Sequence, residues 1–211
     1  SGPPTAKTGA PGESTCTQCH SGSVMNGDGV NNLILMDASQ QVVTEYIPGE
    51  TYTVSITTQA ASKRGFQVSP RILSNNTRAG TSTGITSLSA VQSTSTQQYI
   101  NHVSSSTNAS SWEFNWTAPS TNQGDVRFYL ATNVANGNNS SSGDNIFTSQ
   151  HTFSAVAGAS IQENSDSQQF SVYYTDDQNR LVFNFYLQNF YILVSFLLNL
   201  YSVNLSFFFF S

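Results

Sequence analysis

Two stretches of the chain alternate between apolar and polar residues with a period of two. In residues 51–57 and 111–117 every second residue is apolar; these positions are Tyr52, Val54, Ile56, Trp112, Phe114 and Trp116. Because successive side chains of a β-strand point to opposite faces, the alternation predicts two strands with one buried face each.

Shorter apolar runs continue this pattern as far as residue 156. They cover residues 33–36, 66–68, 71–73, 126–130 and 146–153. Pro70 separates two of these runs and is predicted to place them on an edge strand or at a bulge. Residues 80–96 are rich in Ser and Thr, which favours a long loop or a weak strand. No stretch has helical periodicity, so the pattern predicts an all-β fold, an antiparallel β-sandwich of about seven or eight strands.

The composition is typical of an exported β-protein. Charged residues make up 9% of the chain and aromatic residues 12%, while Ser, Thr, Asn and Gln are abundant. The net charge of −5 and the lack of any Lys/Arg cluster exclude a general nucleic-acid-binding surface. The chain starts at Ser1 without a Met, so we expect a mature product from which a signal peptide has been removed.

The strongest chemical signal is the run Cys16-Thr17-Gln18-Cys19-His20, which contains the only two cysteines of the chain. A Cys-x-x-Cys-His run is the attachment site of c-type haem, in which two thiols form thioethers with one porphyrin and the histidine is the proximal iron ligand. A disulfide in an exported protein, a thioredoxin-like redox pair and a zinc site are the alternatives. No βαβ pattern and no nearby ligands accompany the motif, so one covalently bound haem c on Cys16, Cys19 and His20 is favoured.

The second axial ligand of the iron is less clear from the sequence. His102 is the favoured candidate, since strand alternation in residues 99–103 places it on the same face as Ile100. An open sixth position is the main alternative. The other candidates are Met25, too close to His20 in the chain to pass the porphyrin edge easily; Met36, expected to pack in a strand; and His151, expected to face the core or the haem. Tyr99, Trp112, Trp116 and Phe128 could wall the porphyrin, but a role in the core is favoured.

Several separated motifs together resemble one family. They are Gly9-Ala10-Pro11-Gly12-Glu13 before the cysteine motif, Tyr46-Ile47-Pro48-Gly49, Gly65-Phe66-Gln67, the Tyr99–His102 segment, residues 112–119, Ala135-Asn136-Gly137-Asn138 and Ser142-Gly143-Asp144. Over about residues 1–156 the chain is similar to the reeler-like, "choice-of-anchor V" secreted proteins of Bacteroidota. The resemblance implies a reeler- or immunoglobulin-like sandwich with an N-terminal haem motif and an extracellular or cell-surface location. It supplies no reaction.

The C-terminal end has a different composition. Residues 181–211 contain no charged residue, and residues 181–188 alternate in a way that favours strands, with a turn at Gln188-Asn189. The segments 170–173, 181–189 and 197–200 resemble the type A sorting domain of the type IX secretion system, although its Tyr-Pro-Asn-Pro and glycine-lysine turn are absent. The resemblance implies the secretion translocon or outer-membrane surface proteins as partners. A membrane-spanning or partner-buried anchor, or an unstructured tail, are the alternatives.

These observations predict four segments: a haem-attachment segment at 1–32, the β-sandwich at 33–156, a linker at 157–169 and a sorting- or anchor-like segment at 170–211. The predicted function is that of an exported cell-surface monohaem c-type cytochrome, which exchanges electrons with an unknown redox partner. The alternative is an extracellular adhesion or ligand-binding module in which the haem is structural or sensory. No nucleophile elbow or carboxylate pair is evident, so an electron carrier or binding module is favoured over an enzyme.

Overall fold

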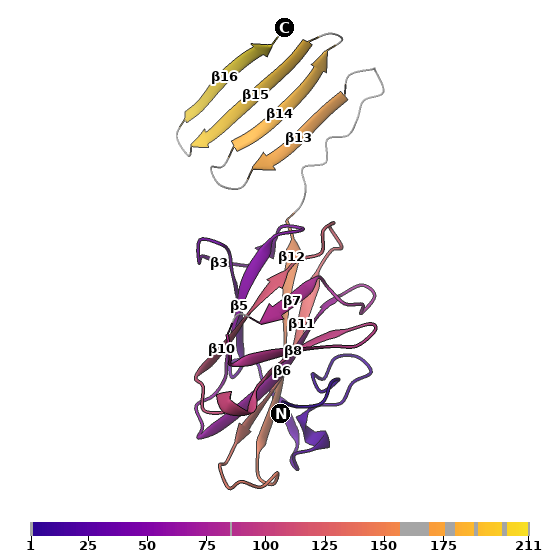
Figure 1. The fold of residues 1–211 in the computed structure, drawn as a ribbon, viewed down its shortest axis with the longest axis vertical. Helices are drawn as coiled ribbons and strands as arrows, with labels where there is room; N and C mark the ends of the chain where they lie inside the picture. The colour runs from indigo at the N-terminus through magenta and orange to yellow at the C-terminus, as the bar shows by residue number, and fades with distance from the viewer. Residues whose placement is uncertain are drawn as a thin grey trace. The chain divides into compact units, whose positions relative to one another are not determined.

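The structure, a computed structural model, describes residues 2–84 and 86–156, together with four strands of the C-terminal part. The chain divides into two compact units, Ser1–Val156 and Ala157–Ser211. The first unit consists of β-strands and two short 3-10 helices, η1 (Cys16–Gln18) and η2 (Ser104–Ser106) (Figure 1).

The strands of the first unit form two sheets. The seven-stranded sheet has the order β1-β12-β11-β6-β9-β8, with β4 also paired to β12. Its strands are β1 (Val24–Asn26), β4 (Glu45–Tyr46), β6 (Lys63–Ile72), β8 (Ser89–Ser93), β9 (Gln98–His102), β11 (Val126–Ala135) and β12 (Asn145–Ala155). The five-stranded sheet has the order β3-β2-β5-β10-β7. Its strands are β2 (Asn32–Met36), β3 (Val42–Val43), β5 (Thr51–Thr57), β7 (Thr81–Gly84) and β10 (Ser111–Thr117).

The hydrophobic core lies between these two sheets. The predicted apolar faces of β5 and β10 are buried there, because Val54, Ile56, Trp112, Phe114 and Trp116 are 0% exposed. They pack with side chains of the facing sheet that include Phe66, Val68, Phe128 and Leu130. Aromatic pairs such as Phe66–Trp112, with ring centroids 5.0 Å apart, add specific contacts. The all-β sandwich predicted from the alternation is therefore confirmed.

Pro70 does not lie on an edge strand. It lies within the ten-residue strand β6, which pairs with β11 along its whole length and with β9 at Gln67 and Val68. Proline has no N–H to donate to a ladder, and Pro70 lies beyond the short stretch in which β6 pairs with β9. Its carbonyl accepts a hydrogen bond from the Ala79 amide at 3.1 Å. The prediction of an edge strand or bulge was therefore wrong, since β6 is an internal strand.

Other differences from the sequence-based picture are small. The Ser/Thr-rich residues 80–96 contain two short strands, β7 and β8, rather than only a loop. The turn-rich residues 21–32 contain β1, which pairs in parallel with β12 through Val24 and Ile146. Strand β1 therefore anchors the end of the cysteine-bearing segment to the edge of the large sheet.

The C-terminal unit contains an antiparallel sheet in the order β13-β14-β15-β16. The strands are β13 (Gln169–Thr175), β14 (Arg180–Leu187), β15 (Phe190–Asn199) and β16 (Ser202–Phe210). Strand β14 thus covers the stretch 181–187 in which alternation predicted a strand. No helix among the described residues has the length and apolar character needed to cross a membrane. Residues 157–168 of the expected linker and the expected turn at Gln188-Asn189 lie outside the described residues.

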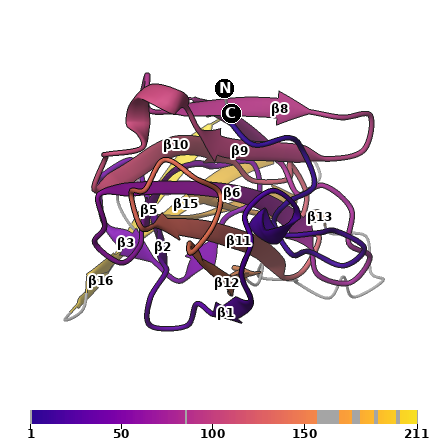
Figure 2. The ribbon, with the colours of Figure 1, turned by 90° about the horizontal axis from the view of Figure 1, so that it is seen from below.

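The N-terminal segment lies on the outer face of the large sheet. Odd-numbered residues of β6 and β11 point away from the core, because the even-numbered Phe66, Val68 and Leu130 belong to the core cluster. Gln67, 0% exposed, accepts a hydrogen bond from Lys7 N at 2.7 Å and donates one to the Pro4 carbonyl at 2.9 Å. Figure 2 shows the indigo coil that contains η1 beside β11.

Candidate functional site

The cysteine motif forms a single turn of 3-10 helix. The side chain of Thr15 caps this turn by accepting a hydrogen bond from Thr17 N at 3.2 Å. The amides of Cys19 and His20 both donate to the Cys16 carbonyl, at 3.1 and 3.0 Å. Side chains three residues apart eclipse one another in a 3-10 helix, so the two cysteines lie on one side of the turn.

The turn opens onto a pocket of about 350 Å³, a size within the range of cofactor sites. Cys16, Cys19 and His20 line this pocket, and so does His102 from the end of β9. The structure therefore brings together all four residues that the sequence singled out, although His102 follows the motif by more than eighty residues. Its other walls come from the N-terminal segment, the start of β6, the residue after η2, and the end of β11 with the following loop: Gly2, Pro3, Pro4, Lys7, Lys63, Arg64, Gly65, Phe66, Thr107, Asn133, Ala135, Gly137, Asn139, Ser140 and Asp144.

His20 is oriented by a buried carboxylate. Its Nδ1 lies 2.7 Å from Oδ2 of Asp144, whose side chain is 1% exposed. Asp144 also accepts hydrogen bonds from Asn133 Nδ2 at 3.1 Å and from Asn136 N at 3.2 Å. Burial alone would raise the pKa of Asp144, but these hydrogen bonds and His20 outweigh it and hold the pKa below its usual value. Because Nδ1 is engaged by Asp144, Nε2 is the nitrogen of His20 that is available to an iron.

The imidazole of His102 occupies the position where the pairing between β6 and β9 ends. Its Nδ1 lies 3.1 Å from the amide nitrogen of Phe66 and 3.2 Å from the Phe66 carbonyl oxygen. In the tautomer that donates from Nδ1 to this carbonyl, Nε2 carries the lone pair that a metal ligand needs. Burial lowers the pKa of His102, the Phe66 hydrogen bond opposes this, and His20 is near enough to add to the lowering. His102 is thus held neutral, as ligation requires.

The remaining ligand candidates lie elsewhere. Met25 lines a different pocket with Tyr129 and Thr148. Met36, in β2, is half-buried and does not line the site with the cysteines. His151 is also absent from that pocket and makes a 3.0 Å hydrogen bond to Ser149 through Nε2. Of the histidines and methionines in the described residues, only His102 joins His20 in the pocket.

The large aromatic residues belong to the core, as favoured from the sequence. Trp112, Trp116 and Phe128 lie in the core cluster and none of them lines the pocket. The aromatic wall of the pocket is Phe66, which the sequence did not single out for this role. Phe66 contacts both the core, through Trp112, and His102, with ring centroids 6.5 Å apart.

Both cysteines are free thiols. Burial raises the pKa of Cys16 to about 11, so this thiol stays protonated at neutral pH once the segment is docked. Among residues 2–84 and 86–156, no group of three or more His, Cys, Asp or Glu is arranged to hold a metal ion by itself. The donors that the pocket offers to an iron are two imidazoles, beside two thiols suited to thioether bonds. This set fits a c-type haem.

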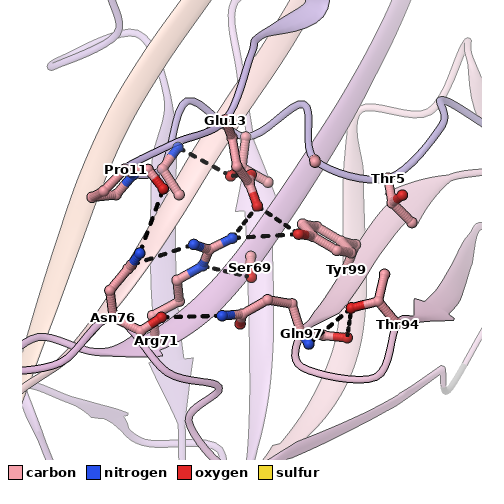
Figure 3. A network of polar contacts seen from close by, with 12 residues as sticks. Thr5, Pro11, Glu13, Ser69, Arg71, Asn76, Thr94, Gln97 and Tyr99 are labelled. Carbon is pink, nitrogen blue, oxygen red and sulfur yellow. Dashed lines mark hydrogen bonds and ion pairs between the residues drawn. The ribbon is translucent and has the colours of Figure 1, made fainter.

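A buried polar network holds the segment before the cysteines in place (Figure 3). Glu13 pairs with the guanidinium of Arg71 and accepts a 2.5 Å hydrogen bond from the hydroxyl of Tyr99. Thr8 donates to the other oxygen of Glu13 at 2.6 Å. The side chains of Arg71 and Glu13 are only 3% and 7% exposed. Glu13 is three residues from Cys16, so this network fixes the position of the motif on the sheet.

The sequence did not identify the residues that support the two histidines. Asp144, Gly65 and Phe66 appeared only within motifs of the family resemblance or, for Phe66, in an apolar run, and Asn133 carried no signal. The Ser142-Gly143-Asp144 motif was the available clue, because a carboxylate after a glycine turn suits a hydrogen-bond partner that orients a metal-ligating histidine.

A family model and several solved structures are similar to this chain. Residues 37–138 match the model of the Reeler domain. No curated protein matches the chain.

The crystal structure of the human F-spondin reeler domain is 18% identical to this chain, with a TM-score of 0.46, and covers 64% of this chain and 94% of its own. A second fragment of that domain is 15% identical with a TM-score of 0.44, covering 66% and 96%. The full-length major pilin SpaD of Corynebacterium diphtheriae is 14% identical with a TM-score of 0.33, covering 57% of this chain and 33% of its own.

Proposed function

We propose that this chain is an exported monohaem c-type cytochrome that transfers electrons outside the cell. The observation that carries the proposal is the convergence of Cys16, Cys19, His20 and His102 on one pocket. His102 belongs to β9, which pairs with one side of β6. His20 is supported by residues of β11 and of the loop after it, and β11 pairs with the other side of β6. A merely structural pair of cysteines would not require a second, neutral imidazole at the same place.

Each of these residues has a separate task. Cys16 and Cys19 would hold the porphyrin through thioether bonds, and His20 Nε2 and His102 Nε2 would ligate the iron. Asp144 accepts the Nδ1 proton of His20, which fixes the ring and makes its Nε2 more basic. The haem, when bound, would supply a one-electron couple whose potential two histidine ligands would keep low. Such a site favours electron transfer over binding of a substrate at the iron.

Location outside the cell is part of this proposal. Reeler domains are typically extracellular, and residues 37–138 match their model. We further infer attachment at the outer membrane through the type IX secretion route. The support is the strand pattern of the tail, whose segments resemble a type A sorting domain, together with the antiparallel order β13-β14-β15-β16.

An adhesion or ligand-binding module is the second candidate. The match to the Reeler domain favours it, since that domain is an extracellular module. In this case the haem would have a structural or sensory role, and the sixth position of the iron would open to bind a small molecule. The two candidates therefore differ in whether His102 stays on the iron.

Two measurements test the proposal. The chain is fused to an export signal and expressed in a bacterium that matures c-type cytochromes. Its intact mass is compared with that of Cys16→Ser/Cys19→Ser. We expect the wild type alone to be heavier by one haem, and its reduced form to show a sharp low-spin absorption band that carbon monoxide leaves unchanged. A wild type without added mass would overturn the proposal. A high-spin spectrum that responds to carbon monoxide would instead favour the binding module.

A further inference from the structure

The pocket gathers positive charge in a chain that is acidic overall. Lys7, Lys63 and Arg64 line it, and they are three of the seven Lys and Arg residues in a chain of net charge −5. Asp144 is the only carboxylate among the lining residues, and it is engaged by His20. An acidic chain thus exposes an excess of cations at one concave site.

None of these three cations has a carboxylate partner among the described residues. Within residues 2–84 and 86–156 the ion pairs are His20–Asp144 and Arg71–Glu13. Lys63 Nζ donates only to the side-chain oxygen of Asn139, at 2.8 Å. The ammonium of Lys7 donates to main-chain carbonyls of its own segment, at 3.1 and 3.2 Å. Neutral acceptors of this kind leave the positive charges uncompensated.

Arg64 supplies the most direct indication of a ligand. Its Nε is buried and has no hydrogen-bond partner, and Oδ1 of Asn133, another lining residue, is likewise buried without a partner. A buried donor of a charged group that lacks a partner is costly, so such atoms usually mark a missing ligand or water. The Arg64 amide donates to the Thr107 carbonyl at 2.7 Å, which fixes the backbone from which this side chain enters the pocket.

We propose that Arg64 and Lys63, with Lys7 beside them, form a carboxylate-binding subsite that recognises the two propionate groups of the porphyrin. The inference rests on the proposed function, because it names the part of the same pocket that takes the acidic side of the ligand. Arginine suits this role, since its planar guanidinium pairs with a carboxylate through two parallel hydrogen bonds. In this proposal the cysteines hold the porphyrin covalently, and the cations pair with its acidic groups.

The test compares two porphyrins that differ only in these acidic groups. The full-length Cys16→Ser/Cys19→Ser chain, which cannot form thioethers, is titrated with ferric protoporphyrin IX and with its dimethyl ester. We expect the free acid to bind about tenfold or more tightly than the ester. Arg64→Gln and Lys63→Gln, each added to this chain, should weaken binding of the acid and leave the ester unchanged.

Arg127→Gln is the matched control. Arg127 lies on the same sheet and donates to Thr152 and Gln150, but it does not line the pocket, so both affinities should stay unchanged. Equal affinities of acid and ester, or no binding of either, would overturn the inference. An acid-to-ester ratio that survives both Arg64→Gln and Lys63→Gln would also overturn it. The proposed function fails separately, on a wild-type chain without covalent haem.

If Arg64→Gln does not fold, judged by its circular dichroism spectrum, the Lys63→Gln variant and the acid-to-ester ratio of the parent chain still decide the matter.

Discussion

Gly65 and His102 are in direct contact across the end of the β6–β9 ladder. A Cβ atom on Gly65 would lie 2.5 Å from Cε1 of the His102 ring and 2.9 Å from its Nε2. No other residue type fits at this position unless the imidazole moves. The missing side chain therefore allows a histidine on the core-facing side of β9 to reach a pocket on the outer face of the sheet.

Gly65→Ala is expected to displace His102 and leave the rest of the site intact. The added methyl group collides with the ring itself, so the low-spin spectrum of the reduced protein should become high-spin and responsive to carbon monoxide. The intact mass should still include one haem, because the cysteines are unaffected. Gly84→Ala is the control, since its Cβ would meet only the Ser89 carbonyl oxygen, at 3.5 Å. An unchanged low-spin spectrum in Gly65→Ala would show that His102 does not ligate the iron.

His102→Ala tests the same ligand without altering the backbone. We expect the same change to a high-spin spectrum, and imidazole added to the solution should restore the low-spin form by occupying the vacated position. The matched variant is His151→Ala, which removes the other half-buried histidine outside the pocket and should leave the spectrum unaltered. If both variants keep the wild-type spectrum, the sixth ligand lies elsewhere.

Asp144→Asn is expected to raise the midpoint potential of the bound haem. The carboxylate increases the basicity of His20 through Nδ1, which stabilises ferric over ferrous iron. A tenfold loss of the preference for ferric over ferrous iron raises the midpoint potential of a one-electron couple by about 60 mV. Redox titration measures the shift, and Asp125→Asn, at an exposed carboxylate outside the pocket, serves as the control. A potential equal to that of the wild type would remove Asp144 from any role at the iron.

Arg71→Met should destabilise the first unit strongly. It leaves the buried carboxylate of Glu13 without its cation, and breaking such a pair by removing one partner costs about 3–5 kcal/mol. Denaturant unfolding followed by tryptophan fluorescence measures the free energy of unfolding. The double variant Glu13→Leu/Arg71→Met should recover part of the loss, because no buried charge then remains unpaired. Arg127→Met, at a more exposed arginine, should change stability by less than about 1 kcal/mol. Similar losses in the two arginine variants would contradict this account.

Tyr99 should make stability fall at high pH. Burial, and after it the hydrogen bond to Glu13, raises the pKa of Tyr99 to about 12, against about 10 in the unfolded chain. Between these values the unfolded chain loses the phenol proton while the folded chain keeps it, so the unfolded state binds fewer protons and stability decreases as the pH rises. Comparing wild type with Tyr99→Phe at about pH 9 and pH 11 isolates this contribution. The decrease should be smaller in Tyr99→Phe, and identical decreases would contradict the assignment.

The sequence predicted the parts of the fold that depend on local alternation. Tyr52, Val54 and Ile56 and the Trp112-Phe114-Trp116 face are buried as expected, because period-two patterning alone decides which side of a strand meets the core. The position of Pro70 could not be predicted, since it depends on where β9 stops pairing with β6. That end point is set by tertiary packing rather than by residues near the proline.

The candidate site likewise contains residues that the sequence predicted and residues whose roles only the structure revealed. The five-residue motif predicted Cys16, Cys19 and His20, because in a c-type haem site this spacing is imposed by the porphyrin and not by the fold. Asp144 and Arg64 became evident only from the structure: their roles depend on the loop after β11 and the start of β6 reaching the same pocket.

If the proposed cytochrome is correct, the two hydrogen bonds of Gln67 with Lys7 and Pro4 would set an order of events during maturation. Once Lys7 and Pro4 are hydrogen-bonded to Gln67, the raised pKa of Cys16 makes its thiol a poor nucleophile. An assembly enzyme would therefore have to reach the cysteines while the leading residues are still undocked. In the proposed cytochrome, docking of the N-terminal segment against Gln67 is the last stage of biogenesis. A chain whose segment docks before haem attachment would remain without haem.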